Sequence, residues 1–307
     1  MTRPALVIPS LGTASLDSCL GAVASLEPGP EPTVVVLSGA AAGRRLPAWV
    51  TAVRSERRLG FAAAVNAGLA SLSRPWPAVA LLNDDAVPEP GWLGALEAAQ
   101  LDDGRLAAVQ GTVLDTLGRI DGRGITLDPF GLPVQVDRGR PAQPEPADPR
   151  PRLAVSGTAC LLRGSALAEV ELAGGGVLDP AVGSYHDDVD LGLRLSRLGW
   201  RASWVPGALC SHVGSQSGAR FRWRHPWWVL ANRWYALAAN LTPAALFRVL
   251  PRLLRGELRA ARALVRSNRR TVLVAPAVLA TLPVLAARGW ARRSAGRRLA
   301  RLPGGRE

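Results

Sequence analysis

The sequence has 307 residues, of which 48% are hydrophobic and 20% charged, and it carries a formal net charge of +13. This composition excludes an intrinsically disordered chain, and the length allows one large or two small domains. The three cysteines (Cys19, Cys160 and Cys210) show no Cys-x-x-Cys spacing. They exclude a disulfide framework and a cysteine zinc site, and they favour a reducing compartment.

The first third of the chain alternates predicted strands and helices. Three short runs rich in Val, Ile and Leu predict strands buried on both faces of a parallel sheet: 5–9, 33–38 and 78–83. The alanine-rich stretch 61–72 predicts a helix between the last two strands, and Pro90 marks the start of another helix. Strands and helices in this order predict a doubly wound α/β sandwich.

Residues 115–150 have a different composition. Glycine, proline and aspartate punctuate short extended pieces there, which predicts a hairpin and a long mobile loop. Regular structure is predicted to resume at 153–162, followed by a helix at 188–198 and a strand at 201–206.

Asn83, Asp84 and Asp85 stand at the end of the predicted strand 78–83. Doubly wound sheets bind ligands beyond the carboxyl ends of their strands. Mg²⁺ and Mn²⁺ bind through one or two carboxylates together with substrate phosphates, and such a cation stabilises a leaving diphosphate as a Lewis acid. The cluster therefore fits a metal site for a nucleoside-diphosphate substrate. An ordinary turn, where Asn and Asp are frequent, is the alternative.

Three carboxylates, those of Asp187, Asp188 and Asp190, crowd the start of the predicted helix at 188–198. The helix dipole favours acids at this position, so simple capping is one interpretation. Close like charges also raise one another's pKa, which suits a general base that takes a proton from an acceptor hydroxyl.

His212 lies in a polar, glycine-rich stretch just after the predicted strand 201–206. A surface histidine or one satisfied by hydrogen bonds is the simpler interpretation. A neutral imidazole can also complete a Mn²⁺ site, so His212 is a second candidate metal ligand.

Taken together, four segments resemble family 2 glycosyltransferases, particularly the bacterial rhamnosyltransferase-like branch. They are 59–69 (LGFAAAVNAGL), 81–93 (LLNDDAVPEPGWL), 155–163 (VSGTACLLR), and 185–206 with 210–217 (CSHVGSQS). In order, they are similar to the helix start that borders the nucleotide site, the metal motif, the strand on the acceptor side, and the acidic base motif with its histidine turn. The likeness covers roughly residues 1–217.

The resemblance implies a GT-A fold, a Rossmann-like sandwich, with a basic and mainly helical C-terminal extension. The catalytic domain would span 1–219, with a nucleotide-sugar-binding part at 1–114 and an acceptor part at 115–219. The extension would span 220–307.

The resemblance also implies a metal-dependent hexosyltransferase that inverts the anomeric carbon in a single displacement. Asp85 and His212 would hold Mg²⁺ or Mn²⁺, and Asp188 would be the base, with Asp187 and Asp190 completing its acidic motif. The donor would lie against Pro9, Ser38, Gly60, Asn66, Asn83 and Asp84.

One stretch departs from the family pattern. The family usually carries an aspartate after its second strand to read the nucleobase, but residues 36–40 (VLSGA) contain no acid. Ser38 or a backbone group would have to substitute. Arg58 stands where the family more often has asparagine; it would either pair with a phosphate or be a solvated surface arginine.

The C-terminal part is strongly basic. Residues 220–307 hold 19 of the 37 arginines but only two acids, Glu257 and Glu307. Residues 221–235 interleave arginine with six aromatic side chains, which fits a lipid headgroup layer, core packing or, least favoured, nucleic acid. The apolar run 271–287 is interrupted by Pro276 and Pro283 and is short for a bilayer span, so an interfacial or re-entrant element is expected.

These features predict a peripheral enzyme at the inner face of the cell membrane, assembling cell-envelope polysaccharide or glycolipid. The apolar run at 5–9 is too short for a signal peptide, so a cytoplasmic location is expected. The donor would be a nucleoside-diphosphate sugar, with rhamnose as the sugar that the resemblance implies, and the acceptor a lipid-linked glycan or polysaccharide. A non-catalytic nucleotide-sugar-binding protein of the same fold is the alternative. A nucleotidyltransferase is less favoured, because 9–13 (PSLGT) lacks a basic residue.

Overall fold

The computed structural model describes residues 3–143, 148–171, 176–182, 184–214 and 224–267, with the single residues 283, 284, 287 and 290. Most of the predicted interfacial element at 271–287 lies outside the described residues, as do residues 221–223. Within the part of the chain that is described, no helix is both long and apolar enough to cross a bilayer.

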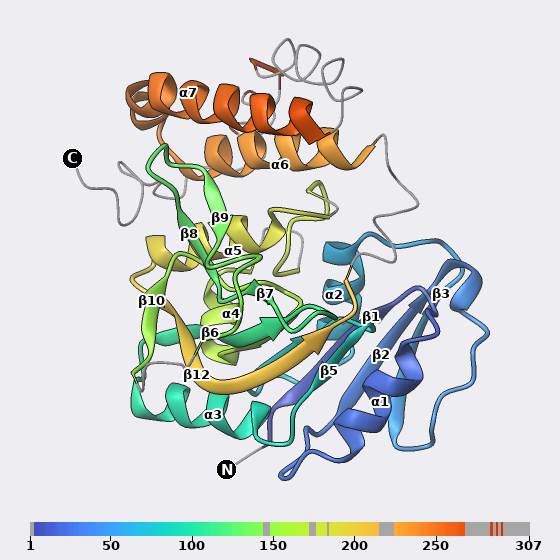
Figure 1. The fold of residues 1–307 in the computed structure, drawn as a ribbon. Helices are drawn as coiled ribbons and strands as arrows, with labels where there is room; N and C mark the ends of the chain where they lie inside the picture. The colour runs from blue at the N-terminus through green and yellow to red at the C-terminus, as the bar shows by residue number, and fades with distance from the viewer. Residues whose placement is uncertain are drawn as a thin grey trace.

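The elements alternate along the chain (Figure 1). The strands are β1 (Ala5–Ser10), β2 (Thr33–Ser38), β3 (Val50–Ser55), β4 (Val79–Leu82), β5 (Ala86–Pro88), β6 (Leu106–Leu114), β7 (Ile120–Gly122), β8 (Ile125–Leu127), β9 (Pro133–Gln135), β10 (Arg150–Arg152), β11 (Ala159–Leu162) and β12 (Arg201–His212). The helices are α1 (Leu16–Ala24), the 3₁₀ helix η1 (Gly39–Ala41), α2 (Phe61–Ala70), α3 (Trp92–Asp102), α4 (Gly164–Glu169), α5 (Asp187–Arg197), α6 (Arg224–Asn240) and α7 (Pro243–Ser267).

One large sheet organises the molecule. Its strand order is β10-β12-β6-β11-β4-β1-β2-β3, with β5 paired to β12 and β7 to β6, and β8 and β9 form a separate hairpin. Strands β3, β2, β1 and β4 run parallel, whereas β11 is antiparallel to both of its neighbours. The chain order reverses between β1 and β4, and ligands bind doubly wound sheets at such a switch point.

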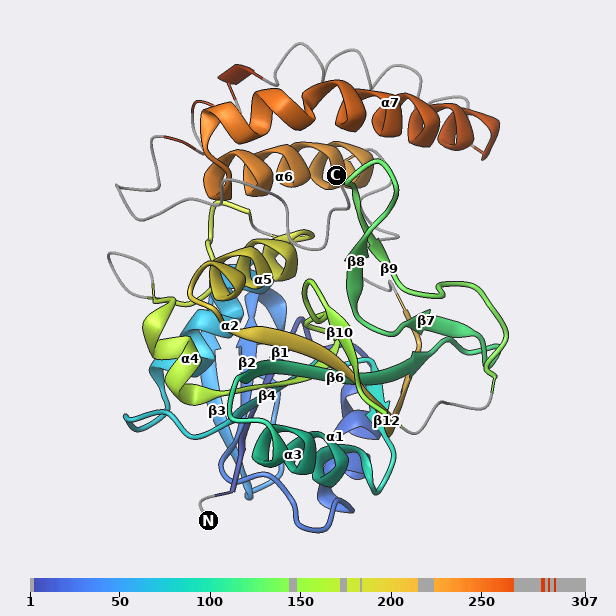
Figure 2. The ribbon, with the colours of Figure 1, turned by 90° about the vertical axis from the view of Figure 1, so that its left-hand side faces the viewer.

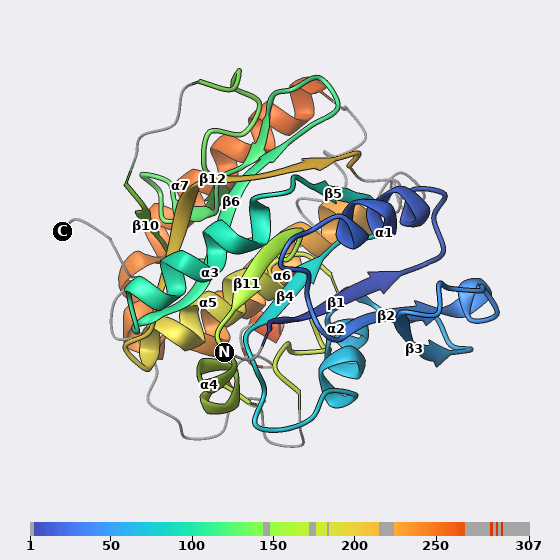
Figure 3. The same cartoon turned by 90° about the horizontal axis from the view of Figure 1, so that it is seen from below.

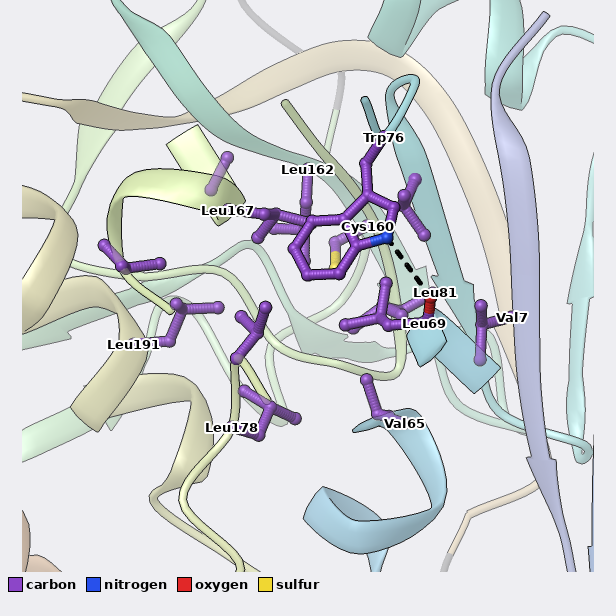
Figure 4. Close-up of a cluster of buried hydrophobic side chains, with 14 of the residues drawn as sticks. Val7, Val65, Leu69, Trp76, Leu81, Cys160, Leu162, Leu167, Leu178 and Leu191 are labelled. Atoms are coloured by element: carbon purple, nitrogen blue, oxygen red, sulfur yellow. Dashed lines mark hydrogen bonds between the residues drawn. The ribbon is translucent and has the colours of Figure 1, made fainter. Parts of the chain in front are cut away.

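Helices cover both faces of the sheet (Figures 2 and 3). Alternate residues of the central strands enter two separate cores, one with α1 and α3 and the other with α2, α4 and α5. Trp76 lies in the second core with Leu162 and Leu167 and donates its indole N–H to the Leu69 carbonyl at 3.2 Å (Figure 4). Each fully buried leucine in these cores contributes roughly 1.5–3 kcal/mol.

A third core joins α6 and α7 to α5 and to the β8–β9 hairpin. Residues 231–240, which complete α6, are all buried, including Trp234 and Tyr235. The lipid-surface interpretation of 221–235 is therefore wrong for Trp234 and Tyr235, which pack in the interior. Aromatic rings interleaved with arginines suit both a lipid headgroup layer and a protein interior. The burial of the helix in the structure distinguishes these two environments.

The predicted strands and helices are present, but some bounds differ and a central strand was not predicted. The strand predicted at 201–206 continues to His212, which is therefore a strand residue and not part of a turn. Strand β6 was not predicted, because Gln110, Gly111 and Thr112 interrupt its apolar pattern although all of β6 except its last residue is buried. Of the stretch 153–162, only Ala159–Leu162 forms a strand.

A bulge in β12 depends on Gly111 of β6. The pairing of the two strands shifts between Trp204 and Leu209, so that residues 205–208 of β12 stand opposite the single residue Gly111. A Cβ atom at Gly111 would lie 1.7 Å from the Ala208 carbonyl oxygen, which is backbone and cannot rotate away. Glycine therefore allows β12 to approach β6 closely and then resume pairing as far as His212.

We predict that Gly111→Ala lowers the free energy of unfolding by about 3 kcal/mol, because the added methyl group forces the two backbones apart. Urea denaturation measures this loss. The matched control is Gly94→Ala in α3, where a Cβ atom meets nothing within 4 Å. That control should be neutral or stabilising by up to about 1 kcal/mol; equal stability of the two variants would contradict the prediction.

Candidate active site

A cleft of about 1480 Å³ opens at the carboxyl ends of β1, β2 and β4. Its wall includes the loop before α5, the β8–β9 hairpin and one side of α6. The predicted site residues that line it are Pro9, Ser38, Gly60, Asn83, Asp84, Asp85, Asp187, Asp188 and His212. Residues more than 200 positions apart in the sequence therefore face one cavity.

Asp84 is fixed across the switch point between β1 and β4. One of its carboxylate oxygens, Oδ2, accepts hydrogen bonds from the Ser10 hydroxyl at 2.6 Å and the Thr13 hydroxyl at 3.0 Å. Burial raises the pKa of Asp84, although these hydroxyl donors act in the opposite direction. Asp84 thus ties the two strand ends together and faces the cleft with limited freedom to move.

Asp85 and His212 meet because β5 and β12 pair in antiparallel register. Ala86 stands opposite His212 in that pairing, and the Val213 N–H donates to the Asp85 carbonyl at 3.0 Å. The imidazole Nε2 consequently lies 3.1 Å from Asp85 Oδ1, with both side chains largely buried. The two predicted metal ligands are thus adjacent although 127 positions separate them.

The other imidazole nitrogen of His212 has a partner that the sequence analysis missed. Nδ1 lies 2.9 Å from Asp121 Oδ2 on β7, and Asp121 also pairs with Arg138 at 3.1 Å. The hydrogen bond from His212 lowers the pKa of Asp121. Carboxylate partners of this kind fix the orientation of metal-binding histidines and raise their basicity.

A proton bridges Asp85 and His212 when no cation is present. Burial alone lowers the pKa of His212, but the hydrogen bonds from Asp121 and Asp85 outweigh it and raise that pKa to about 9. The imidazole is therefore protonated at neutral pH and donates to both carboxylates.

The donor atoms at this position suit a divalent cation. A carboxylate oxygen and an imidazole nitrogen face each other, and loss of the bridging proton frees both for one ion. Among the residues that the structure describes, no cluster of three or more His, Cys, Asp or Glu side chains is arranged to hold a metal. Asp85 and His212 thus fit a cation that takes its remaining ligands from substrate phosphates and water.

The acidic turn before α5 has an unusual backbone. Tyr185 and His186 both adopt left-handed conformations, with φ of 69° and 64°, which cost energy in residues other than glycine. Asp187 and Asp188 follow at the first positions of α5. Such strain persists only where surrounding contacts hold it, and it is typical of functional sites.

Asp187 and Asp188 share a poorly hydrated corner of the cleft. Burial raises the pKa of Asp188 to about 6, while its oxygen Oδ1 accepts the Val189 N–H at 2.8 Å. Burial, and then the charge of Asp188, raise the pKa of Asp187 well above its usual value. The pair therefore holds one proton readily near neutral pH and presents one carboxylate to the cleft.

The backbone of this turn is held by Asn232 of α6. The Asn232 amide group donates to the carbonyls of Val182 at 2.6 Å, Ser184 at 2.7 Å and Tyr185 at 3.2 Å. Without the Asn232 amide, each of these carbonyls would lose a hydrogen-bond donor in a partly buried site, which costs about 1–3 kcal/mol of stability per carbonyl. Asn232 was not among the predicted site residues, because its segment was assigned to the basic tail.

Two further bonds tie α6 to the same region. The Tyr235 hydroxyl donates to Asp179 Oδ2 at 2.7 Å, and the Asn240 amide donates to Asp190 Oδ1 at 2.8 Å. Asp190 is fully buried and also pairs with Arg194 at 3.0 Å. Asp190 does not line the cleft, so it is a structural member of the acidic motif.

Asn66 also lies outside the cleft lining, contrary to the donor-binding prediction. Its amide nitrogen donates to the Leu178 carbonyl at 2.7 Å, and its amide oxygen accepts the N–H groups of Val177 and Leu178. All three bonds join α2 to the segment before α5. Its position near Gly60 in the sequence suggested a nucleotide contact, but the Asn66 side chain points away from the cleft, towards residues 177 and 178.

The end of the cleft beside β2 contains a hydroxyl and an arginine but not the acid that the family usually carries there. The Ser38 hydroxyl accepts the Leu59 N–H at 3.3 Å, which joins the end of β2 to the start of α2. Arg58 lines the cleft beside them. Ser38 and Arg58 therefore lie at the same end of the cleft, and their contact with a nucleotide stays a prediction.

Comparison with known proteins agrees with this geometry. A family model described as "Glycosyltransferase like family 2" matches residues 23–235, and 191 chains of solved structures match. GalNAc-T7, solved with UDP, GalNAc and Mn²⁺, superposes at a TM-score of 0.58 and 15% identity, covering 78% of this chain and 48% of that chain. This chain thus spans about half the length of that protein. The match confirms the predicted GT-A fold.

A second solved structure covers more of both chains but superposes less well. It is the mannosyltransferase PcManGT from Pyrobaculum calidifontis in complex with GDP-Man and Mn²⁺, with a TM-score of 0.49 and 17% identity over 94% of this chain and 88% of that chain. A search of curated protein sequences gives no match.

We predict that Asp121→Asn lowers the pKa of His212 from about 9 towards the ordinary value near 6.5, because the imidazolium loses one of its two carboxylate partners. An NMR titration of the histidine ring protons in metal-free protein measures this pKa. The control is Asp115→Asn, whose carboxylate bonds to Arg119 and not to His212. An unchanged His212 titration in Asp121→Asn would contradict the prediction.

Proposed function

The chain belongs to glycosyltransferase-like family 2, and from this premise we propose that its cleft transfers a sugar from a nucleoside-diphosphate sugar to an acceptor hydroxyl. The single observation that carries the proposal is the placement of the Asp85–His212 pair and the Asp187–Asp188 pair in one cleft. One pair suits a cation for a diphosphate, and the other suits a base for a hydroxyl.

Asp188 is the proposed base. The acceptor oxygen attacks the anomeric carbon while its proton passes to the Asp188 carboxylate, and the bond from that carbon to the diphosphate breaks. The diphosphate leaves with the electron pair, and the configuration inverts in a single displacement. A carboxylate with a pKa of about 6 is ionised at neutral pH and is still basic enough to assist the attack.

Asp85 and His212 are the proposed ligands of Mg²⁺ or Mn²⁺. Bound there, the cation would supply Lewis-acid stabilisation of the diphosphate as its negative charge grows. Asp121 would keep the His212 ring oriented through Nδ1. Asp84, held by Ser10 and Thr13, would limit where the phosphates can lie.

The donor would lie along the carboxyl ends of the parallel strands. Pro9, Ser38, Gly60 and Asn83 line this end of the cleft, and Arg58 is placed to pair with a phosphate. The resemblance to the rhamnosyltransferase-like branch favours a deoxyhexose donor such as rhamnose.

The proposed acceptor is a lipid-linked glycan in the assembly of cell-envelope polysaccharide or glycolipid. The acceptor would enter between α6 and the β8–β9 hairpin, where Trp228, Val229 and Val134 give the cleft apolar walls. The basic extension of 220–307 would keep the enzyme peripheral at the inner face of the membrane.

A non-catalytic nucleotide-sugar-binding protein is the second candidate. One observation favours it: η1, which follows β2, and Ser38 before it offer no carboxylate to read a nucleobase. Release of nucleoside diphosphate from UDP-, GDP- and dTDP-sugars with Mn²⁺ separates the two functions. Thermal stabilisation by a donor without any such release would support the second candidate.

We predict that Asp188→Asn lowers transfer at least 100-fold, because an amide cannot accept the acceptor's proton. Wild-type kcat should rise about tenfold per pH unit below the Asp188 pKa of about 6 and level off above it, since only the ionised carboxylate acts. Donor binding, measured by calorimetry, should be nearly unchanged.

The control is Asp102→Asn at the end of α3, which lies outside the cleft. It should retain wild-type turnover and the wild-type pH profile. Wild-type turnover in Asp188→Asn, or a flat profile around pH 6, would show that Asp188 is not the base.

A further inference from the structure

The outer face of α7 carries a stripe of apolar side chains. Phe247 is 67% exposed, Leu254 39% and Leu258 53%. Their spacing of seven and four residues places them on one side of the helix, and Pro251 lies on the same side. Exposed apolar stripes of this length are uncommon on a helix that only packs against its own protein.

Arginines border this stripe on one flank. Arg248, Arg255 and Arg262 follow one another at intervals of seven residues and are all exposed. The only acid of α7, Glu257, is buried on the opposite side, where it lies 3.2 Å from Arg233 and accepts the Trp234 indole N–H. The outer face of the helix is therefore apolar and cationic without any carboxylate.

The inner face of α7 is fixed to the rest of the protein. Leu246 and Leu253 enter the core shared with α5 and α6. Arg252 donates to the Pro129 carbonyl at 2.6 Å, and the Arg259 guanidinium lies 5.7 Å from the centre of the Phe130 ring, both at the tip of the β8–β9 hairpin. The outer stripe is thus presented on a helix whose orientation is set.

We propose that the outer face of α7 docks on a bilayer surface rich in anionic phospholipid. Phe247, Leu254 and Leu258 would enter the boundary between headgroups and acyl chains, and the three flanking arginines would pair with lipid phosphates. A second copy of the chain fits the stripe less well, because the arginines beside its own α7 stripe would lie against the arginines of the first copy.

Helix α6 separates α7 from the proposed acceptor end of the cleft. Helix α6 lies between α7 and α5, with Trp228, Val229 and Asn232 in the cleft lining and its other side against α7 (Figures 1 and 2). A bilayer on α7 would meet the protein next to α6 and the hairpin. The relevance to a lipid-linked acceptor rests on the proposed function, but the docking itself does not.

Sedimentation of the full chain with vesicles tests the proposal. The wild type should sediment with phosphatidylcholine vesicles rich in phosphatidylglycerol, should not do so with phosphatidylcholine alone, and should be released by salt. The triple variant R248Q/R255Q/R262Q should bind roughly 100-fold more weakly, since each arginine near anionic lipid contributes about a factor of five. F247S/L254S/L258S should lose binding to a similar extent.

Two matched controls separate this surface from general charge and hydrophobicity. R45Q/R57Q/R150Q removes three exposed arginines elsewhere, and L101S/L117S removes two exposed leucines outside α7. Both controls should bind as the wild type does. All variants should keep the wild-type thermal transition, because the changed side chains are exposed.

Three results would overturn the proposal. They are absence of wild-type binding to anionic vesicles, unchanged binding by both α7 variants, and self-association that the stripe variant abolishes while vesicle binding persists. Nucleoside-diphosphate release in the absence of vesicles is measured in parallel. If the wild type releases no nucleoside diphosphate, the proposed function is contradicted, whereas the vesicle result is unaffected.

Discussion

The antiparallel pairing of β5 with β12 is the constraint on which the candidate site depends. The register that sets Ala86 opposite His212 brings the imidazole to within 3.1 Å of Asp85. Before it reaches β5, β12 bulges against Gly111 of β6 and then pairs with β6 again as far as Leu114. The register of two strands thus determines where the two predicted metal ligands meet.

The second half of the site depends on α6. The left-handed turn at Tyr185 and His186 is held by the amide of Asn232, and the helix that follows is held by the bond from Asn240 to Asp190. The proposed base, Asp188, and its supporting turn are therefore held in place partly by the C-terminal extension. Residues 228–241 belong to the site as much as to the extension.

The sequence predicted the elements whose pattern is local. The uninterrupted apolar run at Thr33–Ser38 gave its strand with the correct bounds, and the acids at the start of α5 marked a helix N-terminus. Strand β6 escaped because Gln110 is polar, yet it is fully buried with its amide oxygen accepting the Ser156 N–H at 2.6 Å. Local hydrophobic pattern cannot show that a polar side chain will find its partner 46 positions away.

The site residues divide in the same way, into those with a local sequence signal and those that depend on a distant partner. Asp85, Asp188 and His212 were found by motif, and the structure places all three on the cleft. Asp121 and Asn232 act through bonds that span 91 and about 50 positions, and no local signal distinguishes them from ordinary surface residues. Asn66 was misplaced for the converse reason, since its motif position suggested a ligand and its bonds proved internal.

The central claim is that Asp85 and His212 bind the cation that the donor's diphosphate requires. Pulsed electron paramagnetic resonance of Mn²⁺ bound with UDP, GDP or dTDP tests it directly, because an imidazole ligand couples its ¹⁴N nucleus to the ion. The account predicts one ¹⁴N coupling in the wild type that disappears in His212→Gln. A wild-type spectrum without nitrogen coupling, or a coupling that survives in His212→Gln, would contradict it.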